Sequence, residues 1–347
     1  MRTRSVASVA TFLLMSAVAT VANAQVGGSW GYDTGTGQQG NTYGGYTTPP
    51  VIAPPPNASS GARSDEEIAV LYGTSAGLGA TIGLWFDAEA GIKDPGLQFI
   101  APVVLGLAAP VGVYFLDYPP LPKGMPAAIS AGIFLGIGEG INIWSYQFAS
   151  ANQDDAWRFK GASRAMAIGG TLGAGAGFAL GYYQEPSPKS SFLIGSAAVW
   201  GSIVGSMVGY GASNADYDFD RANDSGALGS LIGYNVGMAA AGGLSALYVP
   251  AWDSIGWMWA GAGIGAAAGI PLYLVYAGSD SPAKRGLILH GVAVTLGIAA
   301  GGIFSSHLTD TFASDSTDTR PKLAEITNLG LMTVDGGMGV QLMGTLF

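Results

Sequence analysis

The stretch AIGGTLGAGAGFALGYY, residues 167–183, places Gly169, Gly173, Gly177 and Gly181 inside one apolar run. Glycine weakens an exposed helix by about 1 kcal/mol per residue, so its repetition here needs a structural reason. Residues four apart lie on one face of a helix, and this spacing predicts a flat stripe of glycines. In lipid, helices associate by close approach of their backbones, which small residues permit. The stretch therefore predicts a membrane helix that packs tightly through its glycines.

Seven further segments are also apolar and, at about 20 residues or more, long enough to span a bilayer as a helix. The eight predicted spans cover residues 66–86, 97–116, 125–148, 161–183, 191–211, 225–248, 254–277 and 284–307. Aromatic residues gather at their ends, as in membrane-interface belts, and no charged stripe runs along them. Only 11% of all residues are charged. The sequence therefore predicts an all-α polytopic membrane bundle of about eight helices.

Glycine stripes at four-residue spacing recur in the other segments. The predicted helix-packing positions are Gly132, Gly136, Gly140, Gly169, Gly173, Gly177, Gly201, Gly205, Gly209, Gly233, Gly237, Gly265, Gly269, Gly297 and Gly301. From the fourth segment onward the stripes also repeat every 32 residues, as in the column formed by Gly169, Gly201, Gly233, Gly265 and Gly297. Such a fixed period predicts tandem helix-plus-joint repeats near residues 161–308.

The runs from Gly169 to Gly181 and from Gly201 to Gly209 resemble the glycine-zipper segments of bacterial envelope proteins. Those proteins are mostly small membrane-associated or lipoprotein components with structural or pore-forming roles. The resemblance covers residues 130–306 at most, and this chain differs in having more helices and no lipobox cysteine. The resemblance implies a structural or pore-forming membrane component of the cell envelope.

The N-terminal region differs from the apolar body of the chain. Residues 1–24 carry two arginines, an apolar core and the small-x-small site Ala22-Asn23-Ala24, a pattern typical of a Sec-type signal peptide. Residues 25–62 are rich in Gly, Tyr and Pro without periodicity, which predicts a disordered exported tail. A helical membrane domain is then expected over residues 63–308.

The C-terminal region, residues 309–347, is expected to form a polar linker and a short β-hairpin that turns at Asp335-Gly336-Gly337. An outer-membrane barrel is the alternative for the whole exported chain. Barrel strands, however, are about 10 residues long and alternate apolar with polar residues, unlike the long apolar segments of this sequence. The barrel is therefore the less favoured architecture.

Net charge and cysteine content exclude several classes of function. The formal net charge is −9 without a basic cluster, which argues against a nucleic-acid partner. The chain has no cysteine, so disulfides, thiol nucleophiles and thiolate metal sites are excluded. The expected partner is membrane lipid, with a homo-oligomer as a further possibility. Basic residues follow the positive-inside rule only faintly, so export to the cell envelope leaves the inner and the outer membrane both open.

Polar residues inside predicted spans are the candidate functional positions, because charge within a membrane is costly. Glu139, in GIGEGIN, is either a cation or proton site or the structural partner of Arg164. His290 is either a titrating group or a side chain hydrogen-bonded to a neighbouring helix. Asn142 and Asn235 predict hydrogen bonds between helices.

An acidic stretch, DYDFDRAND, is a weak candidate for calcium binding through Asp216, Asp218, Asp220 and Asp224. An EF-hand loop requires Gly at its sixth and Glu at its twelfth position, where this chain has Arg221 and Ala227. A solvated acidic loop is therefore the better interpretation. No other metal or cofactor motif and no catalytic motif is found, so an enzyme is not expected.

Two functions remain after these exclusions. The first is a structural or scaffold component of the envelope, based on tight helix packing and sparse buried polarity. The alternative is a channel or transporter with Glu139 as its intramembrane polar site. The alternative is based on the intramembrane polar residues Glu139, Arg164 and His290 and on the tandem repeats. The prolines at positions 102, 110 and 271 also favour it, since interrupted helices recur in transporters.

Overall fold

A computed structural model describes residues 63–152, 154–214, 219–279, 282–305, 324–334 and 337–346. Eight α-helices follow one another in this part of the chain: α2 (Asp65–Ala90), α3 (Ile100–Leu116), α4 (Met125–Ser150), α5 (Phe159–Gln184), α6 (Pro188–Ala212), α7 (Phe219–Leu247), α8 (Trp252–Ala277) and α9 (Gly286–Ser305). Short 3₁₀ helices, η1 (Leu97–Phe99) and η2 (Ala283–Arg285), precede α3 and α9. The all-α prediction for the body of the chain is therefore confirmed, and the barrel alternative is wrong there.

The described residues include part of the C-terminal region. Strands β1 (Ala324–Val334) and β2 (Gly337–Leu346) pair antiparallel, with a register shift between Ile326 and Asn328. Asp335 and Gly336 of the predicted turn lie outside the described residues. So do the predicted signal peptide and exported tail, as well as most of the predicted polar linker.

The helix boundaries follow from local capping chemistry. Ser64 precedes α2, and its hydroxyl accepts a hydrogen bond from the backbone N–H of Glu67 at 3.2 Å. Three acidic residues in the first turn complement the helix dipole. Gly91 ends α2 in the left-handed conformation, with φ at 68°, where the lack of a side chain avoids strain. Helix α6 begins in a similar way, with Ser187 as its cap and Pro188 at its first position.

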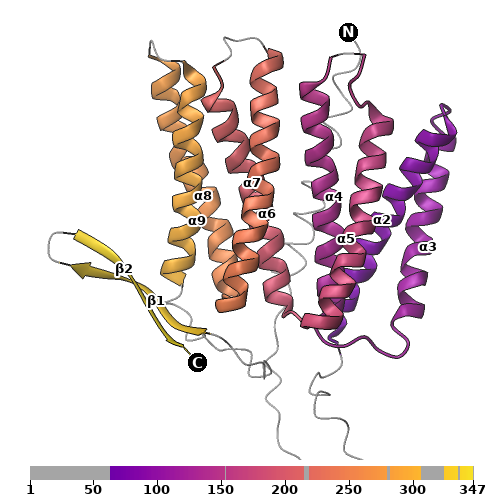
Figure 1. Cartoon of the computed structure of the whole chain (residues 1–347), viewed down its shortest axis with the longest axis horizontal. Helices are drawn as coiled ribbons and strands as arrows, with labels where there is room; N and C mark the ends of the chain where they lie inside the picture. Colours follow the sequence, from indigo (N-terminus) through magenta and orange to yellow (C-terminus); the bar gives the residue numbers. More distant parts are fainter. Residues whose placement is uncertain are drawn as a thin grey trace, which may run out of the picture. The chain divides into compact units, whose positions relative to one another are not determined.

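Consecutive helices pack as antiparallel hairpins: α2 with α3, α4 with α5, α6 with α7, and α8 with α9 (Figure 1). In the α4/α5 hairpin, Gly132 faces Gly173 and Gly136 faces Gly169. A Cβ atom added to any of these four glycines would overlap the carbonyl oxygen of the glycine opposite. Along the hairpin, each step of four residues on one helix is matched by four in the reverse direction on its partner. We call such a line of backbone contacts a seam.

The next two hairpins contain the same kind of seam. Its central pairs are Gly201 with Gly233, Gly205 with Gly229, Gly261 with Gly297, and Gly265 with Ala293. The remaining predicted packing glycines face the backbone of another residue or, at Gly269, a side chain: Gly140 faces Ala165, Gly177 faces Ala128, Gly209 faces Ser225, Gly237 faces Ala197, Gly301 faces Trp257 and Gly269 faces the ring of His290. Every predicted packing position thus lies in a seam between two consecutive helices.

The pairing also shows what the 32-residue period means in three dimensions. Successive copies of the 32-residue repeat, each containing one helix, face each other in the α6/α7 and α8/α9 hairpins. The first copy does not follow this rule, because Gly169 and Gly173 of α5 face α4, which lies before the repeat. The structural unit is therefore a two-helix hairpin rather than a single helix with its joint.

Larger side chains fill the space between hairpins and cover their outer faces. One buried cluster joins α2, α3 and α4 through residues that include Leu71, Val113 and Ile129. A second cluster joins α6, α7 and α8 around Trp200. On α3, by contrast, Leu107 and Phe115 are each 70% exposed. Large apolar side chains at the surface are expected where lipid, rather than water, is the surrounding medium.

Seven of the helices are long and apolar enough to cross a membrane, which indicates an integral membrane protein. The exception among the eight is α5, the helix that contains the opening glycine stretch. Glycine contributes little hydrophobicity, and Lys160 and Arg164 lie near the start of this helix. Composition alone therefore supports seven spans rather than the eight predicted.

Candidate functional site between two hairpins

A cluster of polar side chains lies where α4 meets the α6/α7 hairpin. Asn142 of α4 is only 8% exposed, and its Oδ1 accepts a hydrogen bond from the Ser230 hydroxyl of α7 at 2.7 Å. Ser202 of α6 lies with its Oγ 2.6 Å from that of Ser230. The interhelical hydrogen bond expected of Asn142 is therefore present, and it joins two hairpins that have no glycine seam between them.

Glu139 lies one turn away from Asn142, near the middle of α4. Asn235 of α7 donates its side-chain N–H groups to the two carboxylate oxygens of Glu139 at 3.0 and 3.2 Å. The same amide also donates to the carbonyl of Leu231 at 3.0 Å. Within the described residues no cation lies within ion-pair distance of Glu139. Its partner in this structure is an uncharged amide.

Arg164 does not neutralise Glu139, so that structural alternative is wrong. Its Nε donates to Glu89 of α2 at 3.0 Å, and Lys160 lies 2.7 Å from the other oxygen of the same carboxylate. The reason is a one-residue offset along α5. Ala165 occupies the seam opposite Gly140, so the side chain of Arg164 projects from a different face of the helix.

A tyrosine closes the same interface on the side away from Ser230. Tyr234 is 3% exposed, and its hydroxyl donates to the carbonyl of Leu135 at 2.8 Å. A Cβ atom at Gly138 would overlap that hydroxyl group. Gly138 therefore accommodates an aromatic side chain from α7, a role different from that of the seam glycines on the same helix.

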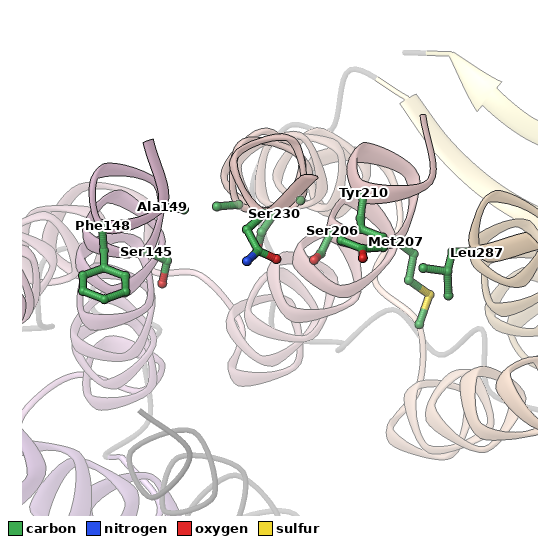
Figure 2. A pocket seen from close by; sticks show the side chains of 11 residues that line it. Ser145, Phe148, Ala149, Ser206, Met207, Tyr210, Ser230 and Leu287 are labelled. Carbon is green, nitrogen blue, oxygen red and sulfur yellow. The ribbon is translucent and has the colours of Figure 1, made fainter. Parts of the chain in front are cut away.

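A pocket of about 490 Å³ continues from the polar cluster toward the C-terminal end of α4. In Figure 2 the lining side chains extend in a row, with Ser145 and Phe148 at one end, Ser230 between, and Ser206, Tyr210 and Leu287 toward the other end. Its other lining residues are Ala149, Met207, Asn223, Gly226, Ala227 and Ser230. Among the described lining residues, none is ionisable in the physiological range. Ser230 belongs both to this pocket and to the cluster with Asn142.

The remaining predicted polar positions lie elsewhere. The ring of His290 packs against Gly269 in the α8/α9 seam and makes no hydrogen bond with another described residue. Asp216 and Asp218 lie outside the described residues, as does the side chain of Asp220, and one oxygen of Asp224 is buried without a described hydrogen-bond partner. In the described part of the chain no three acidic or histidine side chains converge in a way that could hold a metal ion.

A second polar junction, which was not predicted from the sequence, connects the α2/α3 hairpin with the start of α4. Arg63 donates its Nε to Asp117 at 2.8 Å, and its guanidinium lowers the pKa of that carboxyl group. Glu67 is buried and accepts a hydrogen bond from the backbone N–H of Gly124 at 2.8 Å. These contacts fasten the start of α2 to the α3–α4 connection.

The residues missed by sequence reasoning are mostly small or neutral. Ser202 and Ser230 carry no signal that separates them from other serines, and Tyr234 resembles any aromatic residue of a span. Gly79 and Gly83 did carry the four-residue spacing, and they pack against Leu105 and Pro102 of α3. The arrangement as a whole supplies an intramembrane carboxylate, a hydroxyl-rich interface and an uncharged pocket. No protein-family model, curated protein or solved structure matches this chain.

Proposed function

We propose that this chain is a structural component of the bacterial cell envelope, an integral membrane scaffold built from hairpins with glycine seams. The observation that supports it best is the contact between Gly132 and Gly173 and its equivalents in the next two hairpins. Backbones this close leave no space between the two helices for water or for a permeating solute. Close backbone contacts of this kind hold helices together in lipid, as a scaffold requires.

The proposal includes the placement of the chain in the membrane. All eight helices cross it, with α5 carried by its seam against α4, although its own composition is only mildly apolar. The chain reaches the envelope by Sec-type export, with the inner and the outer membrane both open. Lipid is its principal partner, and self-association through the exposed apolar faces is the expected form of assembly.

A channel or transporter is the second candidate, and one observation favours it. Glu139 lies in the middle of a membrane helix with Asn235 as its hydrogen-bond partner and no described cation beside it. Ionisable groups in such positions commonly mark ion or substrate pathways. The hydroxyl groups of Ser202 and Ser230 and the nearby pocket would form one end of such a pathway.

Flux measurements on proteoliposomes separate the two functions. We expect wild-type protein to conduct protons, monovalent cations and small neutral solutes no faster than empty liposomes do, because the seams close each hairpin and larger side chains pack between hairpins. The same measurement is made on Glu139→Gln, which removes the charge but keeps the shape. Glu66→Gln, an exposed position at the start of α2, is the matched control.

Flux that wild type and Glu66→Gln both show, and that Glu139→Gln abolishes, would overturn the scaffold proposal and assign a transport function. Flux that is unchanged in Glu139→Gln would overturn both the scaffold proposal and the role of Glu139.

A further inference from the structure

The pocket between α4, α6, α7 and α9 presents polar groups that nothing in the described part of the chain satisfies. Ser145, Ser206, Tyr210 and Asn223 line it, and none of these four side chains makes a hydrogen bond with another described residue. Each can both donate and accept. The four residues are only partly buried, and their polar atoms are not among the buried unpartnered atoms of the described residues, so these atoms remain accessible from the pocket. The four side chains can therefore exchange hydrogen bonds with groups from outside the chain.

The same lining excludes a charged ligand. None of the described pocket residues carries a formal charge near neutral pH. A phosphate, carboxylate or ammonium group placed between these helices would lose hydration without gaining a counterion. Hydroxyl groups avoid this cost, since they exchange hydrogen bonds with serine, tyrosine and asparagine on equal terms. The matching ligand is neutral and carries several hydroxyl groups.

The apolar part of the lining completes the description. Phe148, Met207 and Leu287 come from three different helices and line the same pocket as the hydroxyl groups. The volume, about 490 Å³, falls in the range of about 300–1,000 Å³ typical of small-molecule sites. Such a mixed lining suits a molecule that has a polyhydroxyl head and an apolar chain.

The position of the pocket along the helices agrees with this ligand. Ser145 and Ala149 lie in the last two turns of α4, and Asn223 lies near the start of α7. In a helix that spans a bilayer, the terminal turns lie at the level of lipid headgroups. We propose that this pocket binds the hydroxyl-bearing head of an uncharged amphiphile of the monoacylglycerol type. This inference goes beyond the scaffold proposal and does not depend on it.

Equilibrium binding of radiolabelled monoolein to the purified full-length protein in detergent tests the proposal. We expect saturable binding of about one molecule per chain. Ser206→Ala removes one neutral hydrogen bond and should weaken binding by about fivefold. Ser206→Leu also fills the space and should weaken it by at least about tenfold. The control is Ser245→Leu, the same kind of substitution in α7 at the end away from the pocket, and this variant should bind like wild type.

Two further probes identify which part of the molecule is bound. Methyl oleate has the chain without free hydroxyl groups, and glycerol has the hydroxyl groups without the chain. Weak binding of both supports the amphiphile, whereas glycerol binding as tightly as monoolein assigns the site to a water-soluble polyol and overturns the lipid assignment. Methyl oleate binding as tightly as monoolein, or monoolein binding that neither Ser206 variant weakens although both elute like wild type, would overturn the site itself.

Discussion

Leucine at Gly173 or Gly205 should prevent the chain from being recovered as one folded species. A Cβ atom at Gly173 would overlap the carbonyl oxygen of Gly132 and lie 3.0 Å from the Cα of Gly136. Gly205 has the same relation to Gly229 in the α6/α7 hairpin. Backbone atoms cannot turn aside as a side chain can, so we expect a loss of more than about 3 kcal/mol, beyond ordinary overpacking. Size-exclusion chromatography after detergent extraction measures the outcome.

Gly175 provides the matched control on the same helix as Gly173. It is exposed, and a Cβ atom there would meet no heavy atom within 4 Å. Gly175→Leu should therefore give the wild-type elution profile. Alanine substitutions at the same two positions should change the stability in opposite directions. Gly175→Ala should stabilise the helix by up to about 1 kcal/mol, because alanine is the better helix former, whereas Gly173→Ala should destabilise the protein. If Gly173→Leu and Gly175→Leu elute alike, the seams do not hold the hairpins together.

Alanine at Gly124 should lower the free energy of unfolding by more than about 3 kcal/mol. Gly124 has φ at 84°, where a residue with a side chain is strained by about 1–2 kcal/mol. A Cβ atom there would also overlap the carbonyl oxygen of Pro186, in the connection between α5 and α6. The shift that relieves this overlap would break the hydrogen bond from the Gly124 N–H to buried Glu67. Denaturant titration of the protein in detergent measures the change.

Gly91 is the control position that separates the effect of backbone strain from the effect of the steric overlap at Gly124. Its φ of 68° is similar to that of Gly124, but a Cβ atom there would meet nothing within 4 Å. Gly91→Ala should therefore cost only the backbone strain, about 1–2 kcal/mol. Equal losses for the two variants would mean that the contact between the α3–α4 and α5–α6 connections does not contribute to stability.

The fold was predictable from the sequence to the level of single helices. Length and apolarity define a span, and glycines four residues apart define its packing face, because both depend only on helix geometry. The choice of partner was not predictable, since every helix of the repeat carries an equivalent stripe. Gly169 packs against Gly136 of α4, although α6 carries an equivalent stripe and is joined to α5 by only three residues. The period does not contain the information on which neighbouring helix a stripe meets.

The candidate site was predictable only where a residue type is unusual in a membrane. Glu139, Asn142 and Asn235 stand out for that reason, and the structure places all three at the α4/α7 interface. Arg164 was assigned to the wrong carboxylate, because its direction depends on which neighbouring residue, Ala165, enters the seam. Serine occurs throughout spans as a small residue, so its hydrogen bonds appear only after the helices have been placed.

The central claim is that glycine seams hold even a mildly apolar helix across the membrane. Helix α5 tests this claim most directly, because its composition alone does not qualify it as a span. The chain has no cysteine, so single cysteines at Asp154, before α5, and Gln184, its last residue, can be labelled without background. Both positions are exposed. With a membrane-impermeant maleimide applied from one side of sealed vesicles, the account predicts that only one of Asp154→Cys and Gln184→Cys is labelled, and that the other reacts after the membrane is opened. Labelling of both from the same side would contradict it.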